Sequence, residues 1–164
     1  MKTYHMTLLE LVDNSRTDKH TVHSYLELYE TLLNKRKESA TNILEVGIYH
    51  GGSIKLWHDY FTNATIYGVD LSAIGVHLKY LELDRIKLLG NMDAYSAKCI
   101  ELLGQTRFDM VLDDGPHTLK SQIDFVTLYL PLVKDDGILI VEDVQSIDWL
   151  KNLKMQCRNS LNPV

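Results

Sequence analysis

Several features that define common protein classes are scarce or missing in this sequence. The 164 residues include two cysteines and no Cys-x-x-Cys pair, which argues against a disulfide framework and fits a reducing compartment. No apolar run approaches the roughly 18 residues that a membrane span needs, and residues 1–6 have no apolar signal-peptide core. The formal net charge of −5 argues against a nucleic-acid phosphate backbone as partner. We therefore expect a cytoplasmic protein that binds neither membranes nor nucleic acid.

The composition that remains is that of one globular domain. Hydrophobic residues make up 45% of the chain and charged residues 24%, so a core of ordinary size can be buried. No internal repeat or low-complexity linker divides the sequence. We predict a single domain over residues 1–164, with a helical N-terminal cap over 1–40 and a core over 41–145.

Short apolar segments alternate with segments of helical periodicity in the core region. Two helices are expected in the N-terminal cap, and the second of them should bury Tyr25, Leu28, Tyr29, Leu32 and Leu33. Five alternations of strand and helix predict an α/β fold with a doubly wound, mostly parallel sheet. The expected helices cover 7–13, 21–37, 54–61, 74–81, 93–103, 119–133 and 145–158, and the expected strands cover 42–47, 64–70, 85–89, 108–113 and 137–142.

The sequence after residue 146 contains no convincing further strand, so the sheet is expected to keep an open edge. An unprotected edge strand is an association hazard. We therefore expect a homo-oligomer.

Two of the predicted strands end abruptly at acidic residues. The strand over 108–113 runs into Asp113-Asp114-Gly115-Pro116-His117, and the strand over 137–142 runs into Glu142-Asp143. If the two strands are neighbours, the side chains that follow them converge at one edge of the sheet. Carboxylates and one imidazole in one crevice indicate a divalent metal ion with a base nearby. Neighbouring strand residues point to opposite faces, so Glu142 and Asp143 can share an ion only if the chain turns between them.

A glycine-containing loop follows the first predicted strand. It reads Glu45-Val46-Gly47-Ile48-Tyr49-His50-Gly51-Gly52-Ser53, with the spacing G-x-x-x-G-G, and differs from the G-x-G-x-x-G fingerprint of dinucleotide-binding proteins. Glycines let the backbone approach a ligand closely, and the amides of the following helix favour a polar group. Asp70 ends the next strand, where an acid can accept both ribose hydroxyls of an adenosine.

This loop resembles motif I of the class I S-adenosylmethionine-dependent methyltransferases, a Rossmann-like fold whose sheet usually has two further strands. The resemblance implies S-adenosylmethionine as cofactor and Asp93 as the contact to adenine. It places Asp113 beside the cofactor end of its strand. The implied cofactor-binding residues are Glu45, Gly47, Tyr49, Gly51, Ser53, Asp70, Asp93 and Asp113.

The combination of D-D-G-x-H with E-D resembles, more specifically, the Mg²⁺-dependent sugar O-methyltransferases of the macrocin and mycinamicin type. The segment Ser15-Arg16-Thr17-Asp18-Lys19, followed by His23, Tyr25 and Tyr29, is similar to the N-terminal part of that branch. Pro116 replaces its usual serine. The resemblance implies that Asp114, Glu142 and Asp143 hold Mg²⁺. It implies that His117 is the general base for methyl transfer to a sugar or glycan-like hydroxyl.

Three other functions stay open at this level. The same ion and base could serve a different small hydroxylated acceptor, such as a catechol-like ring. A short C-terminus is compatible with a non-catalytic or partner-dependent module that only binds the cofactor. A nicotinamide oxidoreductase fits less well, because the loop lacks the dinucleotide fingerprint.

Overall fold

A parallel sheet of five strands forms the centre of the protein. The computed structural model describes residues 6–73 and 83–161, and the helix expected over 74–81 lies outside them. The strands are arranged in the order β3-β2-β1-β4-β5, and each neighbouring pair is parallel. Their bounds are β1 Asn42–Val46, β2 Thr65–Val69, β3 Ile86–Leu89, β4 Phe108–Asp113 and β5 Val133–Val141. The predicted α/β fold is confirmed, and β4 and β5 are neighbours as expected.

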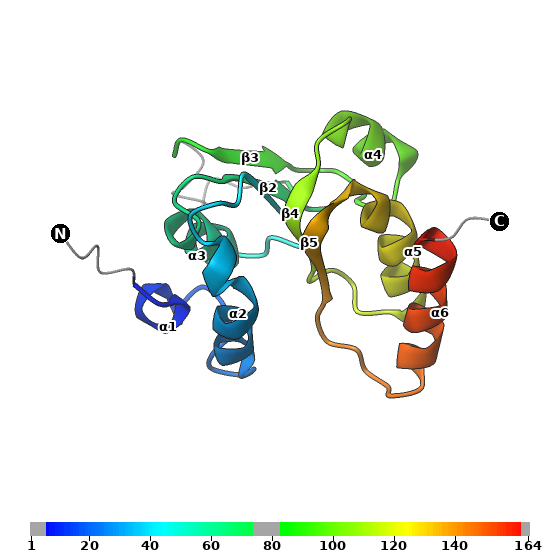
Figure 1. Cartoon of the computed structure of the whole chain (residues 1–164), viewed down its shortest axis with the longest axis horizontal. Helices are drawn as coiled ribbons and strands as arrows, with labels where there is room; N and C mark the ends of the chain where they lie inside the picture. Colours follow the sequence, from blue (N-terminus) through cyan, green and yellow to red (C-terminus); the bar gives the residue numbers. More distant parts are fainter. Residues whose placement is uncertain (1–5, 74–82, 162–164) are drawn as a thin grey trace.

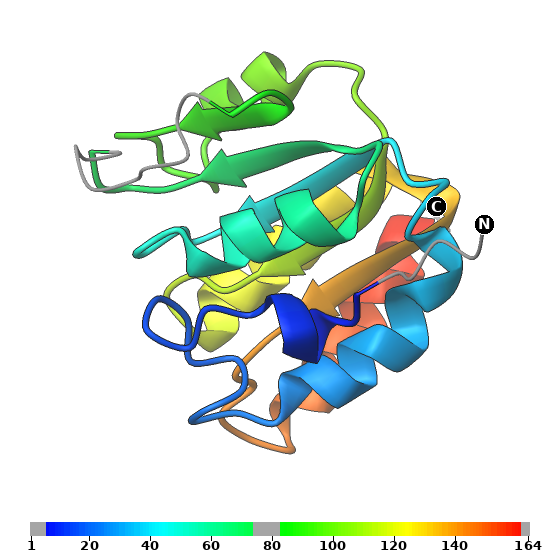
Figure 2. The same ribbon diagram turned by 90° about the vertical axis from the view of Figure 1, so that its left-hand side faces the viewer.

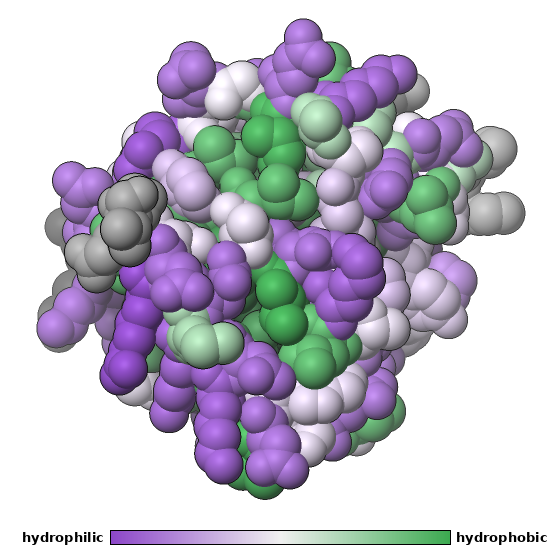
Figure 3. Space-filling view, turned by 90° about the vertical axis from the view of Figure 1, so that its right-hand side faces the viewer, coloured by the Kyte–Doolittle hydropathy of each residue, from purple (hydrophilic) through white to green (hydrophobic). Residues whose placement is uncertain are grey.

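Helices cover both faces of this sheet (Figures 1 and 2). One face packs against α1 (Leu8–Leu11), α2 (Tyr25–Leu33) and α3 (Gly52–Tyr60). The other packs against α4 (Ala97–Leu103) and α5 (Leu119–Tyr129), and α6 (Trp149–Leu161) lies beside α5. Short 3₁₀ turns follow α2 (Asn34–Arg36) and α5 (Leu130–Leu132). The outer surface on the side of α4, α5 and α6 is largely hydrophilic, with a band of apolar side chains in its middle (Figure 3).

The two cores follow from side-chain alternation along the strands. In β4, Met110 and Leu112 enter the core with α2 and α3, while Val111 enters the core with α4 and α5. All six residues of β4 are buried. A strand buried on both faces explains the apolar run Met110-Val111-Leu112, which Asp113 ends at the sheet edge. Asp109, near the start of the strand, is buried with hydrogen bonds to the backbone of Thr41 and Asn42 and to Lys134.

The inward face predicted for α2 is partly wrong. Leu26, Tyr29 and Leu33 are buried, whereas Leu28 is 55% exposed and Leu32 is 41% exposed. The helix is turned because its tyrosines bind acids at the end of β5: Tyr25 Oη donates a hydrogen bond to Asp143 Oδ1. Tyr29 likewise donates to the Glu142 carboxylate. Polar contacts therefore set which face of this helix enters the core.

Strand β5 lies at one end of the sheet among the described residues. It begins at Val133, four residues earlier than predicted, and its pairing with β4 contains a register shift between Phe108 and Met110. Within the described ranges, no helix is both long and apolar enough to cross a membrane. The homo-oligomer and the division into cap and core stay predictions.

Candidate functional site

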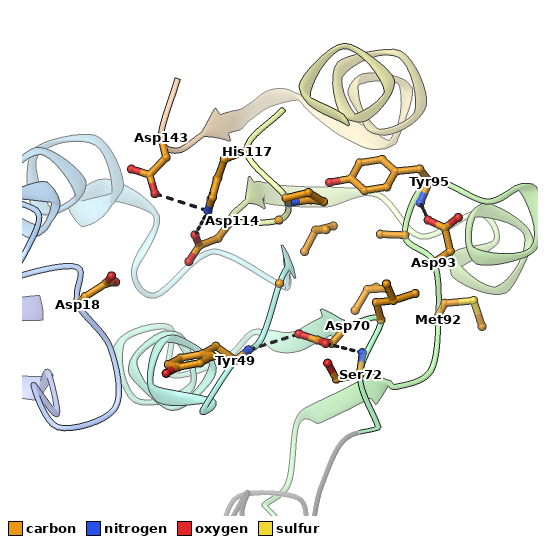
Figure 4. A pocket seen from close by; sticks show the side chains of 17 residues that line it. Asp18, Tyr49, Asp70, Ser72, Met92, Asp93, Tyr95, Asp114, His117 and Asp143 are labelled. Carbon is orange, nitrogen blue, oxygen red and sulfur yellow. Dashed lines mark hydrogen bonds and ion pairs between the residues drawn. The ribbon is translucent and has the colours of Figure 1, made fainter. Parts of the chain in front are cut away.

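A cavity of about 640 Å³ opens at the carboxyl edge of the sheet (Figure 4). The sheet order reverses between β1 and β4, and the loops that follow these two strands form the middle of the cavity. Such reversal points are where open α/β sheets bind ligands. The lining residues come from all five strand ends and the N-terminal segment: Asp18, Val46, Gly47, Tyr49, Val69, Asp70, Leu71, Ser72, Met92, Asp93, Ala94, Tyr95, Asp114, Gly115, Pro116, His117 and Asp143.

Among the described residues, four of the five non-glycine residues with a left-handed backbone lie at this edge, and the fifth, Arg85, precedes β3. Tyr49, Asn91, His117 and Asp143 have φ values of 46°, 50°, 53° and 51°. Each follows a different strand, namely β1, β3, β4 and β5. Such conformations are unfavourable for residues with a side chain and persist where surrounding contacts impose them, often at ligand sites. The strain here coincides with the cavity, since three of the four residues line it.

Asp114, His117 and Asp143 meet at one end of the cavity (Figure 4). His117 Nε2 lies 3.7 Å from Asp114 Oδ1 and 3.6 Å from Asp143 Oδ2. One ligand atom from each residue can be chosen so that all three lie within 4.8 Å of one another. The two carboxylates supply the oxygen donors that Mg²⁺ prefers, so they fit the predicted ion, and the imidazole of the predicted base lies beside them.

Glu142 does not belong to this group of three, although Lys19 links its carboxylate to that of Asp114. Its carboxylate is buried, lies 2.6 Å from Lys19 Nζ and accepts a hydrogen bond from Tyr29. Burial raises the pKa of Glu142 to about 8. The chain turns after Glu142, because Asp143 has a left-handed backbone, and the two acids therefore reach different surroundings. That Glu142 shares the ion stays a prediction.

Lys19 is a residue of the site to which the sequence reasoning gave no role. Its ammonium lies 2.8 Å from Asp114 Oδ2, so Asp114 and Glu142 flank the same positive charge. The only available signal was the similarity of Thr17-Asp18-Lys19 to the N-terminal part of one methyltransferase branch. That similarity assigns no role, and the role appears only when the N-terminal segment packs against the ends of β4 and β5.

Asp70 lies at the other end of the cavity. This position is compatible with the predicted contact to a ribose. Its Oδ2 accepts hydrogen bonds from the backbone N–H groups of Ile48 and Tyr49, at 2.7 and 3.3 Å, and its Oδ1 accepts one from Ser72. Burial alone would raise the pKa of Asp70, yet these backbone donors hold it below its usual value. The carboxylate is therefore fixed and charged, with acceptor capacity left for hydroxyl groups.

Three more predicted cofactor residues are at or beside the cavity. Gly47 has φ +89°, and a Cβ placed there would lie 2.1 Å from the backbone oxygen of Asp114. The side chain of Tyr49 is largely exposed at the cavity rim. Asp93 lines the cavity, and its Oδ1 accepts a hydrogen bond from the backbone of Tyr95.

The structure does not bring the other four predicted cofactor residues to the cavity wall. Gly51 is the left-handed residue that precedes α3. Glu45 is fully buried below the loop and accepts hydrogen bonds from Trp57 Nε1 and from the Ser53 side chain. Burial raises the pKa of Glu45 to about 7. Asp113 is buried and accepts a hydrogen bond from Tyr95 Oη at 3.1 Å. Glu45, Ser53 and Asp113 are therefore buried around the site and do not line the cavity.

Asp113 leads to a prediction about stability and pH. Burial raises its pKa to about 6 from a reference value of 3.8, so the folded protein binds this proton more tightly than the unfolded chain does. The contribution to stability is complete below about pH 4 and is lost as the pH rises through about 6. Asp113→Asn should therefore gain up to about 3 kcal/mol of unfolding free energy relative to the unsubstituted protein between pH 4 and 8. Urea unfolding across this range, with EDTA present, measures the difference, and parallel curves for the two proteins would contradict it.

Comparisons with known proteins agree with this geometry. No family model matches the sequence. Over 134 residues the chain is 34% identical to 8-demethyl-8-(2-methoxy-alpha-L-rhamnosyl)-tetracenomycin-C 3'-O-methyltransferase of Streptomyces olivaceus, a match that covers 74% of this chain and 32% of the relative. Over 141 residues it is 26% identical to 8-demethyl-8-alpha-L-rhamnosyl tetracenomycin-C 2'-O-methyltransferase of the same organism, covering 81% of this chain and 36% of the relative. The chain thus spans about a third of the length of these curated relatives.

A solved structure shares the fold over nearly the whole chain. It is the MycE methyltransferase from the mycinamycin biosynthetic pathway in complex with Mg and SAH. The TM-score is 0.68 at 27% sequence identity, and the match covers 92% of this chain and 39% of the other. Similarity in sequence and similarity in structure therefore both point to methyltransferases.

Proposed function

Because this chain belongs to the class I S-adenosylmethionine-dependent methyltransferase family, we propose that it methylates a hydroxyl of a sugar or glycan-like acceptor in a Mg²⁺-dependent reaction. One observation carries the proposal. A single cavity has the fixed carboxylate of Asp70 at one end and the cluster of Asp114, His117 and Asp143 at the other. The first suits a nucleoside, and the second suits an ion with an ionisable hydroxyl.

The cofactor end of the cavity fits an adenosine-containing ligand. Its volume of about 640 Å³ lies within the usual range for small-molecule sites. Asp70 would accept the ribose hydroxyls, and Asp93 would contact the adenine. Gly47 keeps the loop free of a side chain where it meets the backbone of Asp114. Tyr49 and Gly51 would shape the approach to this end, with Glu45, Ser53 and Asp113 beneath them.

The acceptor end fits proton removal beside an ion. When bound, S-adenosylmethionine would supply an electrophilic methyl group and Mg²⁺ would lower the pKa of the acceptor hydroxyl. Asp114 and Asp143 would hold the ion, with Glu142 as the third carboxylate that the sequence predicts. His117 Nε2 would take the hydroxyl proton, since it faces the same space as both aspartates. Asp18 lines the cavity from the N-terminal segment and would face the acceptor.

Calorimetry with the cofactor and its product tests the first half of the proposal. We expect S-adenosylmethionine and S-adenosylhomocysteine to bind, and we expect Asp70→Asn to weaken both by about tenfold or more, because a neutral amide accepts ribose hydroxyls less well. Asp148→Asn, an exposed acid ahead of α6, is the matched control and should change neither affinity. Failure of both compounds to bind would remove the proposal.

Product formation with and without metal tests the second half. Glycosylated acceptors are incubated with S-adenosylmethionine in Mg²⁺ or in EDTA, and methylated product is followed by mass spectrometry. Turnover that requires Mg²⁺ supports the proposed reaction. Cofactor binding without turnover on any hydroxylated acceptor would instead favour a module that only binds the cofactor.

A further inference from the structure

The side chain of Lys19 is a buried cation surrounded by acids. It is 1% exposed, and its Nζ lies 2.6 Å from Glu142 Oε2, 2.8 Å from Asp114 Oδ2 and 3.6 Å from Glu45 Oε1. Three carboxylates within 3.6 Å of Nζ offset the burial of its charge. A charged ammonium therefore belongs to the site as built.

One positive charge is shared among three carboxylates at this point. Tyr29 donates a hydrogen bond to Glu142 but carries no charge, and Glu45 Oε1 is a buried oxygen without a hydrogen-bond partner among the described residues. Uncompensated buried carboxylates repel one another and favour any additional cation. When all three acids are ionised, the surroundings of Lys19 carry an excess of negative charge.

Asp114 links this ammonium to the proposed ion site. Its Oδ2 faces Lys19, whereas its Oδ1 faces His117 Nε2 at 3.7 Å. A divalent cation beside Asp114 would lie close to the ammonium and would be repelled by it. A cation that also used Glu142 would need the carboxylate that Lys19 already holds.

We propose that the Lys19 ammonium competes with the divalent cation for Asp114 and Glu142, and so limits how tightly the ion binds. This inference rests on the proposed ion site and does not depend on methyl transfer. Lys19 acts as a positioning residue, since it holds two carboxylates together and is not among the residues that line the cavity. The proposed competition implies that Mg²⁺ binds weakly and exchanges readily.

Calorimetric titration of the full chain with MgCl₂, without cofactor, tests the competition. Lys19→Met removes the ammonium and keeps an apolar chain of similar length, so Mg²⁺ should bind at least about tenfold more tightly than in the unsubstituted protein. The melting temperature should also become more dependent on Mg²⁺, because the ion now compensates the buried acids. Lys154→Met, at an exposed lysine of α6, is the matched control and should leave both quantities unchanged. Unchanged or weaker Mg²⁺ binding by Lys19→Met would overturn the proposal.

A second pair of variants covers the case in which Lys19→Met does not fold. Glu142→Gln removes one buried charge, and the double variant Lys19→Met with Glu142→Gln then removes the ammonium from a less acidic environment. The double variant should bind Mg²⁺ at least about tenfold more tightly than Glu142→Gln alone, and equal affinities would overturn the proposal. These titrations need neither cofactor nor acceptor. A protein that fails to methylate sugars but shows the expected Mg²⁺ affinities would reject the proposed reaction and leave the competition standing.

Discussion

Replacing His117 by asparagine is expected to lower kcat for methyl transfer by about two to four orders of magnitude, the usual contribution of a general base. Asparagine lacks a group that can take the hydroxyl proton. It tolerates the left-handed backbone that His117 adopts, at φ 53°, better than most residues do. The loop between β4 and α5 should therefore keep its shape. The affinity for S-adenosylhomocysteine should stay within about threefold, because the base contacts the acceptor and not the sulfonium.

Two further measurements separate a base from a metal ligand. His117 belongs to the group of residues that could hold the ion, so Mg²⁺ affinity is measured on the same variant. Loss of turnover with Mg²⁺ affinity nearly unchanged identifies a base, whereas a parallel loss of both identifies a ligand. His20→Asn, at an exposed histidine of the N-terminal segment, is the control and should keep full activity. Near-normal turnover in His117→Asn would contradict either role.

The sheet could be predicted because its signals are local. An apolar run that stops at an acid, here Met110-Val111-Leu112 before Asp113, marks the end of a buried strand, and β4 occupies the six residues expected, Phe108–Asp113. The same acids then located the site, because the ends of β4 and β5 are neighbours in the sheet. Asp114, His117 and Asp143 meet as that reasoning required.

The polar network behind the site could not be predicted, because its contacts are long-range. Lys19 reaches Asp114 and Glu142 across 95 and 123 positions of sequence. A single lysine in a polar loop is normally solvated, and nothing in its neighbours indicates burial. The rotation of α2 was missed for the same reason, since the acids that bind Tyr25 and Tyr29 lie far along the chain.

Strand alternation also limits what a motif can say about individual residues. The resemblance gave Glu45 and Asp113 to the cofactor, yet both side chains are buried beneath the loop. Glu45 lies two positions before Gly47, and Asp113 lies one position before Asp114. Gly47 and Asp114 do line the cavity. The motif therefore identifies a loop that lies at the cavity, but the direction of each side chain depends on where the strand ends.

Replacing Gly47 by alanine is expected to destabilise the fold by roughly 2–5 kcal/mol, through backbone strain together with a steric clash. A Cβ at this position would lie 2.1 Å from the backbone oxygen of Asp114, and a backbone atom cannot move aside as a flexible side chain can. The clash would separate the β1 loop from the β4 loop and weaken the hydrogen bond from Asp114 N to Val46 O, which is 2.8 Å long. Urea unfolding measures the loss, and calorimetry should show weaker binding of S-adenosylhomocysteine and of Mg²⁺ together.

Gly104→Ala separates the two causes. Gly104 also has positive φ, +61°, but the nearest atom to a Cβ there is Glu101 O at 3.7 Å, an ordinary contact. This variant therefore carries the conformational strain without the clash, and about 1–3 kcal/mol is expected, with ligand affinities unchanged. Gly47→Ala could lower the free energy of unfolding no more than Gly104→Ala does and bind both ligands normally. That result would contradict the role of Gly47 in the close approach of the two loops. A larger loss confined to Gly47→Ala would establish that cofactor loop and ion site share one backbone contact, so that any residue with a side chain at position 47 disturbs both.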